Sequence, residues 1–312
     1  MKIVITGALG HIGSRLIRAL PDSFPDAEIL MLDNLSTQRY CSLFNLPTQG
    51  RYRFMEADIL TADLEKLFDD AAAVVHLAAI TNAEGSFKIH ERVERTNFVG
   101  TQRVAEACAR TGVPLMFLST TSVYGTQAEV VDEECAPHEL KPQSPYAESK
   151  LRAERLLKVL GDDSGLRFAI CRFGTIFGSS VGMRFHTAVN KFIWQACMGI
   201  PLTVWTSALD QQRPYLDLED AIRATEFIIH RDLFNGQIYN VLTINATVRQ
   251  VVDTIREFVP DVRVELVDHQ IMNQLSYTVS SRKFIGLGFE FKGELRQRVA
   301  ESIELFRGIR GW

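Results

Sequence analysis

Cysteine, net charge and long apolar runs are all scarce in this chain. Its 312 residues contain five cysteines without CxxC or CxxH spacing, which argues against a disulfide framework and against a zinc site, so we expect no metal. A formal net charge of -4 with interspersed signs gives no long-range positive field. We therefore expect neither nucleic acid nor an anionic membrane as a partner.

No segment reaches the roughly 18 consecutive apolar residues that a membrane span requires. The chain runs from Met1 to Gly7 directly into a strand pattern, without the charged, apolar and cleavage regions of a signal peptide. Together with the scattered cysteines, this predicts a cytoplasmic protein. Apolar residues make up 46% of the chain, enough for one large core or for two lobes that share a cleft.

Short apolar runs alternate with helical patterns over about the first 170 residues. This alternation predicts an α/β fold with a doubly wound parallel sheet of the Rossmann type. The stretch Thr111-Gly112-Val113-Pro114 is a typical stop signal for a helix. The predicted strands are 2–5, 28–32, 74–77, 115–118 and 168–171, and the predicted helices include 11–20, 97–111 and 146–160.

The pattern changes after about Gly174, where glycines and Pro201 interrupt helical segments at 187–198 and 220–230 and short strands are expected near Leu202 and Gln237. We divide the chain into residues 1–174, the main part of a first domain, and residues 175–312, mainly a smaller α/β substrate lobe. No linker separates the two, so we expect them to be interleaved around a ligand cleft.

A glycine-rich turn, Gly7-x-x-Gly10-x-x-Gly13, follows the first predicted strand and opens a helix. Its backbone amides can approach a pyrophosphate at the positive end of that helix. The second strand ends in Asp33, about twenty residues further on, where a carboxylate accepts ribose hydroxyls and repels a 2'-phosphate. An ordinary turn and a helix-capping Asp33 are the alternatives, but a glycine-rich turn followed by an acid at this distance favours dinucleotide binding. The carboxylate favours NAD over NADP.

Tyr146 and Lys150 lie at i and i+4 at the start of a predicted helix and so project from one face. An ammonium group one turn away favours the phenolate and brings the phenol closer to a useful range for acid/base catalysis. An exposed tyrosine beside a solvated lysine is the alternative interpretation.

Four consecutive hydroxyl residues, Ser119 to Ser122, end the apolar strand 115–118. Hydroxyls at the carboxyl end of a parallel strand face the ligand crevice, where they can donate to a sugar oxygen. The alternative is a Ser/Thr turn that caps the strand.

Seven motifs occur in order along the chain: Thr6-Gly7-x-x-Gly10-x-x-Gly13, Asp33-Asn34, Asp58-Ile59, His76-Leu-Ala-Ala79, Asn97-x-x-Gly100-Thr101, Thr120 to Gly125 and Tyr146-x-x-x-Lys150. In this order they resemble the extended short-chain dehydrogenase/reductase family, and more narrowly its nucleotide-sugar epimerase/dehydratase branch. The resemblance is close over about the first 180 residues and looser beyond them.

The resemblance implies NAD as the cofactor and a nucleotide-sugar, most plausibly a UDP-sugar, as the substrate. It makes Tyr146 the acid/base on a sugar hydroxyl, Lys150 the group that holds the nicotinamide ribose and tunes Tyr146, and Thr120 the assisting hydroxyl. The implied cofactor-binding residues are Gly7, Gly10, His11, Ile12 and Gly13 at the pyrophosphate, Asp33 and Asn34 at the adenine ribose, Asp58 and Ile59 at the adenine, and Leu77, Ala78, Ala79, Asn97, Tyr146 and Lys150 toward the nicotinamide.

In the second lobe, Arg213 resembles the family's diphosphate clamp, with a surface salt bridge as the alternative role. Dehydratases of the family carry an Asp-Glu pair after the threonine, and related decarboxylases carry Glu, whereas this chain has Thr121 and Ser122. The lack of additional acid/base groups favours an epimerase. The complete set of expected substrate contacts is Thr121, Ser122, Thr175 (where relatives usually have Asn), Asn190, Val204, Trp205, Arg213 and, as a weaker candidate, Arg282.

Three functions remain open on the sequence alone. The first is an epimerase that oxidises a ring hydroxyl, at carbon four by preference, and returns hydride to the other face. The second is a nucleotide-sugar dehydrogenase, ketoreductase or dehydratase, and the third is a non-catalytic dinucleotide-binding module. The resemblance also predicts a homodimer, for which the helices 97–111 and 149–160 are candidate interface elements.

Overall fold

A seven-stranded parallel sheet forms the centre of the computed structural model, which describes residues 1–125, 130–268 and 276–309. The strand order is β11-β7-β5-β4-β1-β2-β3, and every neighbouring pair is parallel. The strands are β1 Lys2–Thr6, β2 Glu28–Asp33, β3 Arg51–Glu56, β4 Ala73–His76, β5 Leu115–Thr120, β7 Phe168–Phe173 and β11 Ile238–Val241. The chain order reverses between β1 and β4, so a crevice opens there at the carboxyl ends of the strands.

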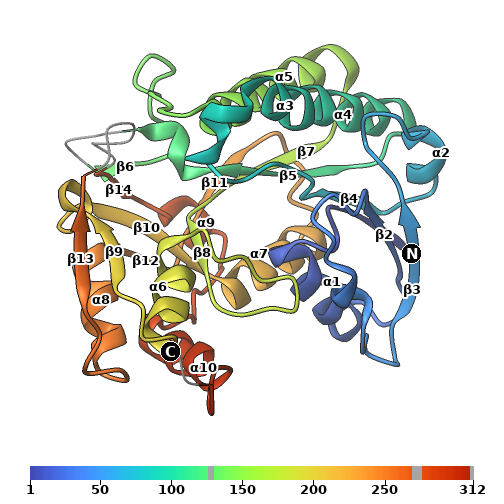
Figure 1. Ribbon diagram of the computed structural model, residues 1–312. Coiled ribbons are helices and arrows are strands. Elements are labelled where there is room, and N and C mark those ends of the chain that lie inside the picture. The colour runs from blue at the N-terminus through green and yellow to red at the C-terminus, as the bar shows by residue number, and fades with distance from the viewer. Residues whose placement is uncertain (126–129, 269–275, 310–312) are drawn as a thin grey trace.

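Helices cover both faces of this sheet (Figure 1), which confirms the predicted doubly wound α/β fold. One face is covered by α1 His11–Ser23 and α7 Leu218–His230, and the other by α2 Leu64–Phe68, α4 Gly100–Thr111 and α5 Pro145–Ser164. A short helix, α3 His90–Val93, and a π-helical turn, Glu94–Val99, lead into α4. The predicted stop is confirmed, since Gly112 ends α4 in the left-handed conformation with φ of 72°.

The edge strand β3 was not predicted from the sequence. Its residues alternate between charged and aromatic or apolar side chains, as in Arg51-Tyr-Arg53-Phe-Met-Glu56, and it pairs only with β2. A half-exposed edge strand lacks the continuous apolar run that marks buried parallel strands.

Two elements beyond residue 174 belong to the large sheet and not to the smaller lobe in which the sequence analysis expected them. The helix α7 shares its core with α1, and the fully buried strand β11 pairs with β7. A further parallel strand can join the sheet only through a crossover connection. The intervening segments of the second lobe provide that connection.

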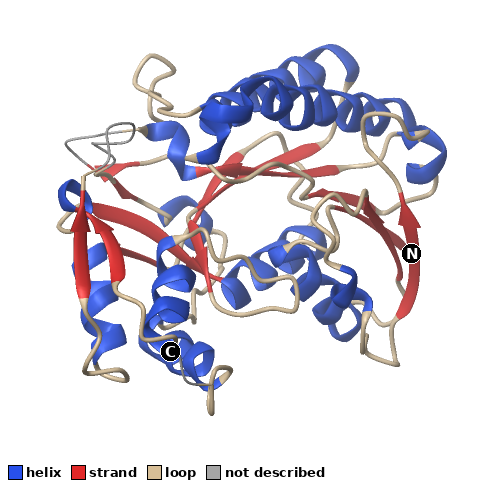
Figure 2. Cartoon of the chain, viewed as in Figure 1, coloured by secondary structure: helices blue, strands red, loops and turns tan. Residues whose placement is uncertain are grey.

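The second lobe has its own hydrophobic core and lies beside the large sheet (Figure 2). Its strands are β8 Thr175–Phe177, β10 Gln212–Asp217 and β12 Ile244–Thr247 in one sheet and β9 Leu202–Trp205 with β13 Val264–Val267 in another, and its helices are α6 Ala188–Cys197, α8 Val248–Arg256 and α10 Leu295–Glu304. The pair β6 Val130–Val131 with β14 Thr278–Val279, the helix α9 Arg282–Gly286 and the short turns η1 Tyr40–Leu43, η2 Gly85–Ile89, η4 Thr121–Tyr124 and η5 Thr206–Ala208 complete the described structure. Within the described ranges, no helix combines the length and apolar character needed to cross a bilayer.

Candidate active site

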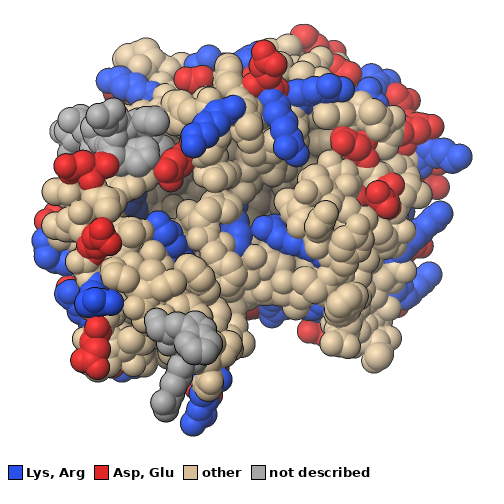
Figure 3. Space-filling model, viewed as in Figure 1, with Lys and Arg blue, Asp and Glu red and all other residues tan. Residues whose placement is uncertain are grey.

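A cavity of about 360 Å³ lies where the carboxyl ends of the central strands face the second lobe. The space-filling view shows this hollow between the lobes, with Lys and Arg atoms visible inside it (Figure 3). Its lining comes from the glycine-rich turn, the loop after β4, the end of β5, the start of α5, and the second lobe. The cleft expected from the interleaved lobes is therefore present as a cavity.

The glycine-rich turn has the geometry needed to bind a dinucleotide diphosphate. Gly7 has φ of +68°, and a Cβ there would lie 2.7 Å from the backbone N of Ala78, while a Cβ on Gly13 would lie 2.5 Å from the oxygen of Gly7. A Cβ on Gly10 would approach only the Gly7 oxygen at 3.3 Å and an Arg39 nitrogen at 3.9 Å, because this position faces the cavity. No side chain caps the first turn of α1, so its positive end is open to an anion. Gly7, Gly10, His11, Ile12 and Gly13 all line the cavity.

The acidic residues after β2 and β3 lie beside this turn and do not line the central cavity. Asp33 accepts hydrogen bonds from the backbone N–H groups of Leu9 and Leu35, both at 3.0 Å, and thereby braces the turn. The amide of Asn34 donates to Asp58 at 3.1 Å, and Ile59 is buried in the core between the sheet and α4. Their expected contacts with the adenosine of a dinucleotide stay predictions.

The loop after β4 contributes Leu77 and Ala79 to the cavity wall, and the N–H of Ala78 donates to the Thr6 hydroxyl at 3.3 Å. His76 itself is fully buried, with its ring nitrogens 2.7 Å and 3.0 Å from the hydroxyls of Thr6 and Thr101. Burial, followed by the charge of Lys150, lowers the pKa of His76 to about 3. This imidazole is therefore a neutral part of the core.

Asn97, expected near the nicotinamide, is fully buried and fixes the loop after β4. Its side chain accepts from the N–H of Ile80 at 2.8 Å and donates to the carbonyl of Ile80 at 2.9 Å. Asn97 also donates to the hydroxyl of Ser149 on α5 at 3.3 Å. Its contacts thus connect the cavity loop to the helix that begins with Tyr146.

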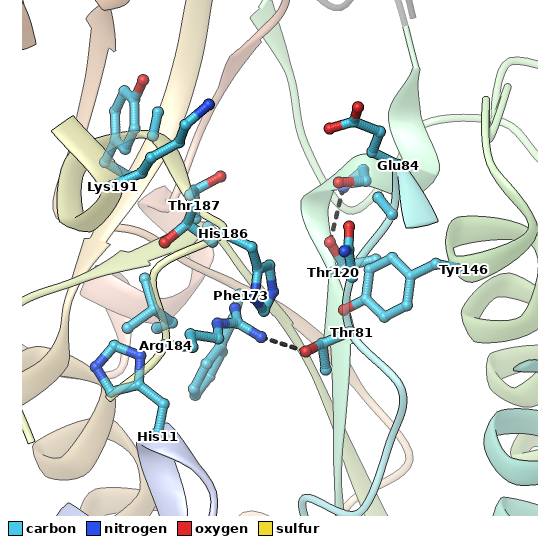
Figure 4. Close-up of a pocket in the computed structure, with 18 of the residues that line it drawn as sticks. His11, Thr81, Glu84, Thr120, Tyr146, Phe173, Arg184, His186, Thr187 and Lys191 are labelled. Carbon is cyan, nitrogen blue, oxygen red and sulfur yellow. Dashed lines mark hydrogen bonds between the residues drawn. The ribbon is translucent and has the colours of Figure 1, made fainter. Parts of the chain in front are cut away.

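Thr120 lies next to Tyr146 in the cavity wall, and its hydroxyl lowers the pKa of the phenol. The two residues meet because Ser144 caps the start of α5 by accepting from the N–H of Ala147 at 3.2 Å, directly beside the end of β5. Figure 4 shows Tyr146 and Thr120 together on one wall of the cavity. Desolvation raises the pKa of Tyr146, and both the charge of Arg184 and the hydrogen bond from Thr120 lower it.

Lys150 is buried one turn further along α5. Its ammonium nitrogen donates to the carbonyl of Leu118 at 2.7 Å and lies 4.6 Å from the centre of the Phe117 ring. Burial lowers the pKa of Lys150 to about 7, against an opposing effect of Glu154. A second cation, Arg184, lines the same cavity, and its charge lowers the pKa of Tyr146. The expected effect of Lys150 on Tyr146 stays a prediction.

The hydroxyl run at the end of β5 divides into cavity and core residues. Thr120 and Ser122 line the cavity, and the Thr120 hydroxyl also accepts from the N–H of Ser122 at 3.1 Å, as in the alternative Ser/Thr turn. The buried hydroxyl of Thr121 donates to the carbonyl of Phe173 at 3.3 Å. Thr121 therefore lies outside the cavity lining, and its expected sugar contact stays a prediction without geometric support.

Four expected substrate residues of the second lobe line the cavity: Thr175, Val204, Trp205 and Arg213. Arg213 donates to the side chain of Gln211 at 3.1 Å, burial lowers its pKa, and no described carboxylate forms a salt bridge with it. This supports a ligand-facing role over the alternative surface salt bridge. Two other candidates lie elsewhere: Asn190 is fully buried beneath the loop 178–184, and Arg282 is exposed at the start of α9.

Several polar residues that line the same cavity were not predicted from the sequence. They lie on connecting loops or on α6, and no spacing or motif distinguishes them from surface residues. Only the tertiary structure brings them beside Tyr146. These residues are Arg39, Thr81, Glu84, Arg184, His186 and Lys191.

The comparison with known proteins agrees with this geometry. Residues 3–241 match the model of the NAD-dependent epimerase/dehydratase family. A trifunctional UDP-glucose 4,6-dehydratase/UDP-4-keto-6-deoxy-D-glucose 3,5-epimerase/UDP-4-keto-L-rhamnose-reductase of Arabidopsis thaliana is 30% identical over all of this chain. The match covers 48% of that protein, so the chain spans about half the length of this curated relative.

Two solved structures extend the similarity to nearly the whole fold. A UDP-glucuronic acid 4-epimerase from Bacillus cereus, in complex with UDP-glucuronic acid and NAD, superposes with a TM-score of 0.89 at 25% identity, covering 98% of this chain and 99% of the other. The UDP-glucose 4-epimerase of Thermus thermophilus, in complex with NAD, gives 0.83 at 25% identity and 99% coverage of both chains. With the family model matching well over half of its length, this chain belongs to the NAD-dependent epimerase/dehydratase family.

Proposed function

We propose that this chain is an NAD-dependent nucleotide-sugar 4-epimerase acting on a UDP-linked sugar. The observation that carries the proposal is the adjacent pair of Tyr146 and Thr120 (Figure 4), which faces the same cavity as an open glycine-rich turn and the cation Arg213. An acid/base group, a diphosphate-binding turn and a second anion site then meet in one enclosed space. That combination suits the oxidation of a sugar that carries its own diphosphate.

In this proposal the dinucleotide lies along the amino-terminal turn. Gly7, Gly10 and Gly13, with the N–H groups of His11 and Ile12, hold its pyrophosphate. Asp33 and Asn34 hold the adenine ribose, Asp58 and Ile59 border the adenine, Leu77 to Ala79 and Asn97 lie on the nicotinamide side, and Lys150 binds the nicotinamide ribose. Bound NAD supplies a hydride acceptor that becomes a hydride donor in the second half of the reaction.

Tyr146 acts as the acid/base in both half-reactions. It accepts the proton of the carbon-four hydroxyl as that carbon is oxidised, and it returns the proton when the keto group is reduced from the opposite face. The Thr120 hydroxyl supports this role because its hydrogen bond lowers the pKa of Tyr146. Rotation of the keto-sugar between the two steps requires space beside Tyr146, which the cavity offers.

The second lobe holds the nucleotide diphosphate end of the substrate. Arg213 is the proposed clamp, since a guanidinium group binds phosphate oxygens in a two-pronged arrangement. Val204 and Trp205 border the nucleotide, and Ser122 and Thr175 are neutral hydrogen-bonding groups for the sugar. The expected contacts of Thr121, Asn190 and Arg282 are not used in this proposal.

A dehydratase is the second candidate because the Arabidopsis thaliana relative carries that activity in its name. Elimination of water from a keto-sugar requires an additional acid and base near the substrate. The positions after Thr120 hold Thr121 and Ser122, and only Ser122 faces the cavity. This favours return of the hydride to carbon four and of the proton to the oxygen on that carbon.

The decisive experiment incubates the purified protein with UDP-sugars and no added dinucleotide, and follows inversion at carbon four. We expect turnover with retained NAD, and loss of about 10²- to 10⁴-fold in kcat for Tyr146→Phe, which removes the acid/base proton. Turnover that requires free NAD(H) would favour a dehydrogenase or ketoreductase. A Tyr146→Phe protein equal to wild type in every assay would favour a non-catalytic dinucleotide-binding module.

We also propose a homodimer formed through α4 and α5, where Val99 is exposed at the end of the π-helical turn that leads into α4 and Val159 is exposed on α5. Light scattering coupled to gel filtration tests this proposal, and Val159→Glu is expected to shift the protein toward monomer. A cytoplasmic location stays a proposal that rests on the unpaired cysteines.

A further inference from the structure

Arg184 is a cation in the centre of the cavity without an acidic partner among the described residues. It lies between β8 and α6, and its side chain extends toward Thr81, to whose hydroxyl it donates (Figure 4). Its Nε is buried and has no hydrogen-bond partner in the described structure. A desolvated, unpaired donor on a charged group is unfavourable unless a ligand satisfies it.

The charges that line the cavity are strongly unbalanced. Arg39 lies near Asp33 and the glycine-rich turn, and Lys191 and Arg213 belong to the second lobe, so these three can serve the two diphosphates of the proposed function. Arg184 is left beside the reacting end, where its charge acts on Tyr146. Among the described lining residues, the cations are Arg39, Lys150, Arg184, Lys191 and Arg213, and the only acid is Glu84.

The backbone around Arg184 is held from two sides. Asn190 on α6 donates to the carbonyl of Arg184 at 3.3 Å, and the N–H of Gly182 donates to the hydroxyl of Ser14 at 2.9 Å. A Cβ on Gly182 would lie 2.5 Å from the oxygen of Leu9, so this segment packs closely against the glycine-rich turn. The guanidinium group is thus preorganised in the cavity and is not a surface side chain that happens to fold inward.

The neighbouring residues do not neutralise this charge. Burial, followed by the charge of Arg184, lowers the pKa of His11 to about 3, so His11 is neutral at physiological pH. Thr120, Ser122 and Thr175 offer hydroxyls without charge. The reacting end of the cavity therefore carries Arg184 as a permanent positive charge, next to Lys150, whose pKa burial lowers to about 7, and to several hydrogen-bonding groups.

We propose that Arg184 binds a carboxylate on the sugar itself, so that the cavity selects a nucleotide-linked uronic acid over the corresponding neutral hexose. This inference rests on the proposed function, because a sugar whose carbon-four hydroxyl faces Tyr146 presents its carbon-five substituent on the adjacent ring atom. Arg184 and Tyr146 line the same part of the cavity (Figure 4), which suits that neighbouring arrangement of hydroxyl and carboxylate. The free Nε, beside the terminal nitrogens, provides the two-pronged geometry that a carboxylate accepts.

The test compares UDP-glucuronic acid with UDP-glucose in the NAD-loaded enzyme. Wild type is expected to prefer the uronic acid, and Arg184→Gln is expected to lower kcat/KM for it by about 10- to 100-fold while affecting the neutral sugar much less. Arg184→Lys keeps the positive charge but lacks the two-pronged guanidinium group, and its kcat/KM for the uronic acid is expected to lie between those of wild type and Arg184→Gln. Arg256→Gln, which removes an exposed arginine paired only with its helix neighbour Asp253, controls for the change in net charge.

Equal losses on both sugars in Arg184→Gln would overturn the proposal, because Arg184 would then act only through Tyr146 or the fold. Loss of NAD from this variant, measured as dinucleotide released on denaturation, would overturn it in favour of a cofactor contact.

Calorimetric binding of both UDP-sugars to NAD-loaded Tyr146→Phe, with and without Arg184→Gln, separates this inference from the proposed epimerase activity. Arg184-dependent preference for the uronic acid in this background supports the inference even if no sugar is epimerised by wild type. Equal affinity for the two UDP-sugars, or a preference that Arg184→Gln leaves unchanged, contradicts the inference even if the epimerase activity is present.

Discussion

The guanidinium group of Arg172 and the carboxylate of Glu154 form a two-pronged ion pair that is almost completely removed from solvent. The two contacts measure 3.0 Å and 2.7 Å, and each side chain is only 2% exposed. Glu154 also accepts from the hydroxyl of Ser119, next to Thr120, and lies one turn after Lys150 on α5. The pair thereby connects β7, the end of β5 and α5, and two of these three elements carry the proposed catalytic residues.

The first prediction concerns this ion pair. Glu154→Gln leaves the buried Arg172 without its counter-charge and is expected to lower the free energy of unfolding by about 3–5 kcal/mol. A double Glu154→Met/Arg172→Met variant removes both charges and is expected to be clearly more stable than the single variant. Denaturant unfolding followed by fluorescence measures both. Equal destabilisation in the single and double variants would argue against an uncompensated charge as the cause.

The second prediction separates two adjacent hydroxyls. Thr120→Val removes the hydrogen bond to Tyr146 and is expected to lower kcat by about 10-fold or more, because a hydrogen bond to an ionising group contributes about 1.5–3 kcal/mol. Thr121→Val removes only the bond to the carbonyl of Phe173 and is expected to leave KM for the UDP-sugar nearly unchanged. A large rise in KM for Thr121→Val would instead restore the sequence-based expectation that Thr121 contacts the sugar.

The third prediction concerns the glycine-rich turn. A Cβ on Gly10 would lie 3.3 Å from the Gly7 oxygen, which a small local shift relieves, and the side chain would project toward the cavity, so Gly10→Val is expected to keep the fold and lose bound NAD. Gly13→Val would force a Cβ into backbone oxygens 2.5 Å and 2.6 Å away and is expected to destabilise the protein itself. Circular dichroism and the dinucleotide content of the purified proteins distinguish the two effects. Full NAD retention by a folded Gly10→Val protein would contradict the assignment of this turn.

The fourth prediction concerns pH. His76 has its folded-state pKa lowered to about 3, whereas the unfolded imidazole titrates near 6.5. Between pH 6.5 and 3 the unfolded state binds more protons, so this contribution to stability is complete above pH 6.5 and is lost as the pH falls. One such histidine contributes a slope of up to about 1.4 kcal/mol per pH unit. We expect His76→Asn to be less stable at neutral pH, but its free energy of unfolding should depend less steeply on pH. Denaturant titrations at several pH values measure this dependence, and a dependence equal to that of wild type would contradict His76 as its source.

Local patterns were enough to predict the framework of the site. The strand and glycine-rich turn around Gly7, the acid at Asp33 and the spacing of Tyr146 and Lys150 depend on neighbours within a few turns or one strand of each other. Their geometry follows from backbone sterics and helical periodicity. The five predicted strands of the central sheet and the end of α4 at Gly112 were confirmed for the same reason.

Other features depended on contacts between distant segments. The edge strand β3 and the late strand β11 were decided by pairing with β2 and β7. Asn97 fixes the loop after β4 because the backbone of Ile80 lies opposite its side chain. Thr121 points into the core, although its neighbours Thr120 and Ser122 face the cavity. No periodicity in the sequence encodes these partners.

The sequence by itself therefore determined a parallel α/β sheet, a glycine-rich turn between strand and helix and a tyrosine–lysine pair, because these are local consequences of apolar spacing, glycine and helical geometry. The tertiary structure decided which further cation joins the tyrosine in the cavity. Arg184 lies on a loop without a recognisable pattern, 38 positions after Tyr146, and it lines the same cavity only because Gly182 packs against the first turn and Asn190 holds its backbone. Electrostatic interaction depends on distance in space, and the fold alone sets that distance.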